Sequence, residues 1–204
     1  VTGASRINGN LNKLTLASWE ADVPVIVTSE AHPDSPDDYW GDDVTAHFSP
    51  DPNFVDTWTK HGRDGTPGAM LHPELLVAQF PERAEVFIKG DVVAASPTED
   101  TSYTGALAHK RGETELLPDY LERRGIAALY VAGLALGNKE HPLCVDSTAI
   151  DFAKRGFDVT VLTDAVEAVF PENRAISFAN MASHGIKLAT TQEALEMIAA
   201  AHAA

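Results

Sequence analysis

The chain has 204 residues, of which 44% are hydrophobic, and this is enough apolar material for one globular domain with a substantial core. Acidic residues outnumber basic ones by 30 to 15. The resulting net charge of −15 argues against nucleic acid or an anionic membrane surface as the main partner, because both bind basic faces. The one cysteine allows no internal disulfide, and no apolar stretch suits a membrane span or a secretory signal. We therefore expect one domain over residues 1–204, located in the cytoplasm.

Apolar runs typical of buried strands alternate along the chain with segments of helical periodicity. A helical pattern covers residues 7–18, a second runs over 116–121 and ends at Gly125, and Thr190 and Glu193 have capping-box spacing before a last helix. This alternation predicts an α/β fold of three layers, with a doubly wound, mostly parallel sheet covered by helices on both faces. The strands are predicted at residues 23–28, 85–89, 129–134, 159–162 and, more weakly, 186–189.

One long segment, residues 30–84, breaks this alternation. It is rich in proline, aspartate, glycine and histidine and has little periodicity. A structureless loop of this length within a compact domain is usually functional. Ligands of α/β sheets collect outside the carboxyl ends of the strands, which is where Glu30, Lys89 and Cys144 are expected to lie. Their shared edge is a stronger indication of a site than any one of the three residues.

Cys144 lies between the end of a predicted strand and the start of a predicted helix. The apolar run 127–135 precedes it, and Val145, Thr148 and Phe152 follow it on one helical face. Free backbone N–H groups and the helix dipole at such a position favour a thiolate nucleophile and supply donors to an oxyanion. Most free cysteines, however, are small buried hydrophobes. On position alone the two interpretations are about equal.

Four residues in or beside the irregular segment could ligate a metal ion. Glu30 and His32 alternate at a strand end and can project to the same side, while His47 and His61 follow in the loop. One carboxylate and three imidazoles suit zinc, iron or manganese. Histidines in polar loops are mostly solvated, so for any single one of them solvation is the more common outcome.

Three further residues could contribute to a site. Lys89 ends a buried strand, where an unpaired lysine is costly, and it could stabilise a neighbouring thiolate; a strand-end lysine more often reaches solvent. Trp58, in a glycine-rich loop, could stack on a flat ring, although loop aromatics more often only pack. Tyr103, beside Gly105, is similarly ambiguous.

Together these segments resemble the nicotinamidase/pyrazinamidase branch of the isochorismatase-like (cysteine hydrolase) superfamily, over essentially the whole chain. The most specific pieces are the segment 58–69 (WTKHGRDGTPGA), the Lys89-Gly90 pair, and Cys144-Val145 followed by Thr148-Ala149 and Asp151. The resemblance implies the doubly wound parallel sheet already expected. It also implies cleavage of small amides, nicotinamide to nicotinate and ammonia in this branch, by a Cys-Asp-Lys triad beside a bound metal.

The resemblance assigns roles to the candidate residues. Cys144 matches the nucleophile and Lys89 the lysine of the triad, and the backbone N–H groups of Ala135 and Cys144 match the oxyanion-hole donors. The remaining residues match the metal ligands and the substrate pocket. The metal positions correspond to Glu30, His32, His47 and His61, and the pocket positions to Trp58 and Tyr103.

This sequence departs from the family pattern in three places. Glu30 stands where the family usually has aspartate, and residues 137–142 form an insertion relative to the family pattern in the loop before Cys144. The family's catalytic aspartate belongs to an Asp-x-Gln-like motif on a central first strand, and the chain begins after that point. We count one strand fewer than the family has, so we expect the full protein to contain a further N-terminal strand that carries this acid. The alternative is that another segment takes the central place.

The sequence therefore predicts a metal-dependent amidohydrolase that acts on nicotinamide or a similar pyridine or pyrazine carboxamide through a thioester. The expected partner is a small amide, with neither nucleic acid nor membrane, and a homo-oligomer is left open. A related cysteine hydrolase of another small amide or ureido compound is one alternative, favoured by the altered loop. The other is a catalytically impaired relative that only binds ligand or metal, which the missing aspartate suggests.

Overall fold

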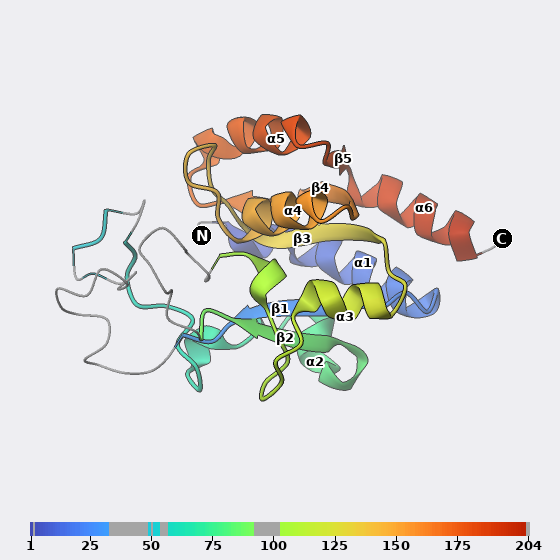
Figure 1. The fold of residues 1–204 in the computed structure, drawn as a ribbon, viewed down its shortest axis with the longest axis horizontal. Helices are drawn as coiled ribbons and strands as arrows, with labels where there is room; N and C mark the ends of the chain where they lie inside the picture. Colours follow the sequence, from blue (N-terminus) through green and yellow to red (C-terminus); the bar gives the residue numbers. More distant parts are fainter. Residues whose placement is uncertain (2, 33–48, 50, 54–56, 92–102, 203–204) are drawn as a thin grey trace.

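The fold is known from a computed structural model, which describes residues 1, 3–32, 49, 51–53, 57–91 and 103–202 (Figure 1). All five predicted strands are present, and every strand pair is parallel. The first strand begins three residues later than predicted, because Pro24 offers no N–H to a sheet ladder. The strands are β1 (Ile26–Glu30), β2 (Glu85–Lys89), β3 (Ala128–Leu136), β4 (Asp158–Ala168) and β5 (Lys187–Ala189).

The helices predicted over residues 7–18 and 116–121, after Cys144 and after Thr190 are all present, whereas the helices Leu76–Gln79 and Arg174–Ser183 were not predicted. The capping box before the last helix is present, since the Thr190 N–H donates to Glu193 Oε2 over 2.7 Å and the Glu193 N–H to Thr190 Oγ1 over 3.3 Å. None of the helices in the described ranges is both long and apolar enough to cross a membrane. The α-helices are α1 (Asn8–Glu20), α2 (Leu76–Gln79), α3 (Leu117–Arg123), α4 (Cys144–Lys154), α5 (Arg174–Ser183) and α6 (Thr191–His202). Short 3-10 helices cover Ala4–Ile7, Pro67–Ala69, Pro81–Arg83, Gly105–Leu107 and Pro171–Asn173.

Helices cover both faces of β4 and its neighbours, as the α/β pattern predicts. On one face, Val159 and Val161 pack with the buried side chains of α4, and α5 packs on α4. On the other face, Leu162 and Ala194 form a smaller cluster to which α1 and α6 contribute. Figure 1 shows α4 and α5 on one side of β3 and α1 on the other. The alternation of side chains along β4 therefore produces the three layers.

The sheet is divided into two parts in the described residues. β1 pairs only with β2, and β3, β4 and β5 form a separate sheet in that order. One edge of β1 and one edge of β3 thus have no strand partner within the described part of the chain. The two edges contribute residues such as Ser29 and Ala132 to the wall of one cavity. The parallel α/β fold is confirmed, whereas continuity of the sheet depends on what lies between these edges.

The packing of α4 can be tested at Phe152, which is 1% exposed and meets the Phe157 ring edge-on at 5.1 Å between centroids. Phe152→Ala leaves a cavity under the helix that begins at Cys144, so we expect a loss of about 3–5 kcal/mol in the free energy of unfolding. Phe80 is 45% exposed, and Phe80→Ala should cost less than about 1 kcal/mol. Urea unfolding measures both, and equal losses would contradict the proposed core.

Candidate active site

A cavity of about 560 Å³ lies between the carboxyl end of β1 and the carboxyl end of β3. Glu30, Lys89 and Cys144 all line it, although they are far apart in the sequence. The parallel register of β1 and β2 pairs Glu30 directly with Lys89, and Cys144 is the first residue of α4. The shared sheet edge expected from the sequence is therefore where the structure places the three side chains.

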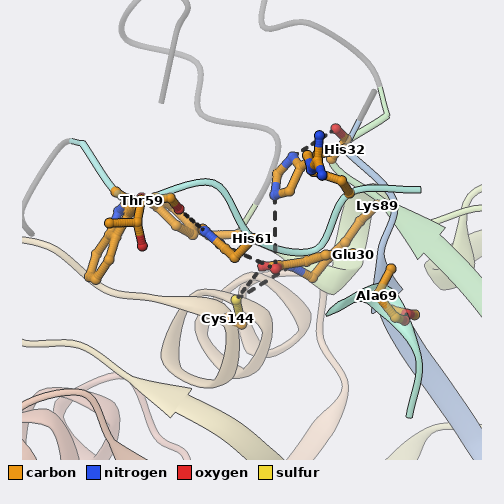
Figure 2. A network of polar contacts seen from close by, with 12 residues as sticks. Glu30, His32, Thr59, His61, Ala69, Lys89 and Cys144 are labelled. Carbon is orange, nitrogen blue, oxygen red and sulfur yellow. Dashed lines mark hydrogen bonds and ion pairs between the residues drawn. The ribbon is translucent and has the colours of Figure 1, made fainter. Parts of the chain in front are cut away.

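Each of the three side chains contacts the other two (Figure 2). Lys89 Nζ lies 3.2 Å from Glu30 Oε1 and 3.4 Å from Cys144 Sγ, and Cys144 Sγ lies 3.4 Å from the same Glu30 oxygen. Lys89 does not reach solvent: its side chain is only 3% exposed. A buried ammonium is stable only with such partners, so this lysine belongs to the site and not to the surface.

The electrostatics of the set favour a charged lysine and a protonated thiol. Burial opposes the charge of Lys89, but Cys144 and Glu30 raise its pKa above the ordinary value. Burial also opposes the charge of Glu30, while Lys89 and His61 lower its pKa overall. For Cys144, burial raises the pKa to about 11, with Lys89 acting in the opposite direction and Glu30 adding to the rise. The thiol needs a proton acceptor before it can act as a nucleophile.

The second oxygen of Glu30 points to two imidazoles. His61 Nε2 lies 3.4 Å and His32 Nε2 3.8 Å from Glu30 Oε2, and ligand atoms of the three residues all lie within 4.8 Å of one another. The other ring nitrogens face backbone carbonyls, His32 Nδ1 that of Gly90 at 3.1 Å and His61 Nδ1 that of Thr59 at 2.8 Å. Such outer contacts orient imidazoles for metal binding, and the donor set suits a divalent cation.

Two glycines let the backbone approach this cluster closely. Gly62 and Gly90 both have positive φ, 53° and 76°. A Cβ at Gly62 would lie 2.8 Å from Glu30 Oε2, and one at Gly90 would lie 2.8 Å from His32 Cε1. Any other residue at either position would displace a candidate metal ligand. The fourth predicted ligand, His47, lies outside the described residues.

Trp58 and Tyr103 meet at the cavity although 45 positions separate them in the sequence. Trp58 Nε1 donates to the Tyr103 hydroxyl over 2.7 Å, and both residues line the cavity. Their hydrogen bond fixes two rings at one wall, which is suited to a flat aromatic ligand.

The predicted oxyanion donors also lie at the cavity. Ala135 is 8% exposed and lines the wall near the end of β3, and Cys144 supplies a first-turn N–H of α4, which has no partner inside the helix. Sequence reasoning missed two features here: the contact of Glu30 with the thiol, and the buried carboxylate of Asp146. An acidic residue in the first turn of a predicted helix was the available signal for Asp146.

The protein-family model of the isochorismatase domain matches residues 1–193 of this chain. The chain belongs to the isochorismatase family. It is 29% identical over 167 residues to the nicotinamidase/pyrazinamidase of Mycobacterium tuberculosis (strain ATCC 25618 / H37Rv). The aligned region covers 80% of this chain and 75% of that protein.

Solved structures share this family fold. A pyrazinamidase of Pyrococcus horikoshii in complex with zinc has a TM-score of 0.65 and 24% identity, and the match covers 93% of this chain and 88% of that one. PnC1 from L. infantum in complex with nicotinate has a TM-score of 0.66 and 22% identity, covering 94% and 83%. At these identities the likeness shows the fold alone.

The influence of Lys89 on the thiol can be measured by alkylation. Lys89→Met keeps a similar shape but removes the charge that favours the thiolate, so the Cys144 pKa should rise and labelling by iodoacetamide at pH 8 should slow roughly tenfold. Lys110→Met is the matched control, because Lys110 pairs with Glu85 at the other end of β2 and should leave the labelling rate unchanged. Equal or faster labelling of the Lys89 variant would contradict the contact.

Proposed function

We propose that the chain is a metal-dependent amidohydrolase that converts nicotinamide, or a similar pyridine or pyrazine carboxamide, to the acid and ammonia. The observation that supports this most strongly is the contact of Cys144 with both Lys89 and Glu30 in a cavity that also holds the His32/His61 cluster. The names of the curated relative and of the zinc-bound structure point to the same reaction.

In the proposed mechanism, Cys144 Sγ loses its proton to a carboxylate and attacks the amide carbonyl carbon. The Lys89 ammonium stabilises the thiolate, and the N–H groups of Ala135 and Cys144 hold the negative carbonyl oxygen. The carboxylic acid then returns the proton to the leaving nitrogen, so ammonia departs and a thioester remains. Water cleaves the thioester, which releases the acid and restores the thiol.

Two carboxylates are candidates for the group that accepts the thiol proton. Within the described residues, the carboxylate oxygen that contacts the thiol is Glu30 Oε1. The family resemblance assigns the role to an aspartate on a further central strand. One feature supports a place for such a strand: within the described residues, one edge of β1 and one edge of β3 have no strand partner. A strand there would pair with both edges and bring its acid next to Cys144.

Glu30, His32 and His61 would hold the metal in this proposal, and zinc, iron or manganese would each suit these donors. When bound, the ion would supply a positive charge that attracts the ring nitrogen of the substrate and so orients the ring. Trp58 and Tyr103 would contact the face of that ring. His47 as a further ligand stays a prediction from the sequence.

A second candidate substrate class is another small amide or a ureido compound. The observation in its favour is the loop of residues 137–143 beside the proposed oxyanion donors, which closes on itself through a hydrogen bond from the Asn138 N–H to the His141 carbonyl. The cytoplasmic location and the absence of a nucleic acid partner stay predictions from the sequence, which leaves a homo-oligomer open.

Substitution of the nucleophile tests the reaction. Cys144→Ala removes the attacking atom, so ammonia release from nicotinamide should fall at least about 10³-fold. Mass spectrometry of acid-quenched wild-type protein should detect the acyl adduct on Cys144, and the variant should lack it. Full activity in Cys144→Ala would refute this mechanism. Turnover of only a ureido compound in a substrate panel would favour the second class.

Metal binding can be tested separately from activity. We expect the protein to bind one zinc ion per chain in competition with a chromogenic chelator, and His32→Ala to weaken this binding about 10- to 100-fold because an imidazole ligand is lost. His72→Ala is the control, since His72 contacts Asn8 and Glu74 away from the cluster. Equal zinc affinity in both variants would exclude the proposed ligand set.

A further inference from the structure

We propose that Asp146 is a positioning residue whose carboxylate fixes the loop between β3 and α4 and thereby places Cys144 and the oxyanion donors. The inference deepens the proposed function and rests on it for the identity of the reaction. Asp146 is 0% exposed, and neither it nor its partner Ser177 is among the residues that line the cavity. It therefore acts through the loop and not by touching substrate.

Three donors converge on this carboxylate from three parts of the chain. Oδ1 accepts from the N–H groups of Gly137 and Leu143, both over 3.1 Å. Oδ2 accepts from the same Gly137 N–H over 3.0 Å and from the Ser177 hydroxyl over 2.6 Å. Gly137 follows β3, Leu143 directly precedes α4, and Ser177 is a fully buried residue of α5. One side chain thus ties both ends of the loop to a packed helix.

A carboxylate suits this position better than a neutral group. Its two oxygens accept from all three donors, whereas an asparagine would turn an NH₂ group toward one of them. Asp146 also lies in the first turn of α4, where the helix dipole favours a negative charge. Burial raises the pKa of Asp146, while the hydrogen bonds from Ser177 and Gly137 act against the rise. The hydrogen bonds therefore offset part of the cost of burying a charge.

The loop itself has little freedom between these two anchored ends. A Cβ at Gly137 would lie 2.1 Å from the His141 carbonyl oxygen, so the chain folds back tightly on this residue. The Asn138 side chain accepts from the Glu140 and His141 N–H groups over 2.9 and 2.8 Å. The segment is thus a compact unit that the Asp146 carboxylate attaches to the protein at both ends.

The anchored ends adjoin the groups that the proposed reaction uses. Leu143 directly precedes Cys144, and Gly137 comes two residues after Ala135. A shift of either end would move the nucleophile or an oxyanion donor, and misplacement of about 1 Å can cost about 100-fold in rate. Asp146 therefore influences the transition state although it lies on the side of α4 that faces α5.

The test compares Asp146→Asn with Asp151→Asn, which makes the same change on the same helix at a partly exposed residue paired with Lys154. We measure KM, kcat per thiol that iodoacetamide titrates, the rate of that labelling, and Tm. Asp146→Asn should lower kcat about 10- to 100-fold with KM within about threefold, and should change the labelling rate. Asp151→Asn should change none of these. Ser177→Ala keeps both N–H contacts and should lower kcat only about two- to fivefold.

A merely structural role for Asp146 predicts a different result. It would lower Tm but leave kcat per titrated thiol unchanged, and that outcome would overturn the proposal. Should Asp146→Asn fail to fold, an unchanged kcat in Ser177→Ala would overturn it and a lowered kcat would support it. Should the wild type release no ammonia from any carboxamide, the proposed function fails. Labelling still decides the positioning role, because equal rates in wild type and Asp146→Asn would overturn it.

Discussion

The rest of the site depends on the contacts that the Glu30 carboxylate makes. One oxygen meets the Lys89 ammonium and the Cys144 thiol, and the other meets the two imidazoles of His32 and His61. The Glu30 side chain therefore connects the nucleophile to the candidate metal cluster. An aspartate in the same place has one methylene fewer with which to span this distance.

Burial makes these contacts interdependent. The thiol and the carboxylate that face Lys89 favour its cationic form in the interior, and Glu30 keeps its charge because Lys89 and the two imidazoles surround it. The same burial raises the pKa of Cys144, so its reactivity depends on how its neighbours are arranged. In a medium of low effective dielectric constant, removal of one group leaves the others with uncompensated charge. The site has to form as a unit.

The buried carboxylate of Asp146 fixes the loop that leads into Cys144. Asp146 lies on the far side of α4 and links the end of β3, the start of α4 and α5. The parallel register of β1 and β2 fixes Glu30 and Lys89, but the thiol comes from the other sheet. In the described residues no strand pairing connects the two sheets, so packing and side-chain contacts across the cavity set the position of Cys144 relative to its partners.

Local sequence determined the elements of this protein, and tertiary structure decided how their side chains meet. Apolar runs and helical spacing predicted the five strands and the helix at Cys144, because period and burial are local properties of the chain. Parallel strands end at one edge, so the meeting of Glu30, Lys89 and Cys144 could also be anticipated. The contacts of the two Glu30 oxygens with different groups, the Trp58–Tyr103 hydrogen bond and the role of Asp146 could not. Each joins residues distant in sequence through side-chain directions that only the packed chain fixes.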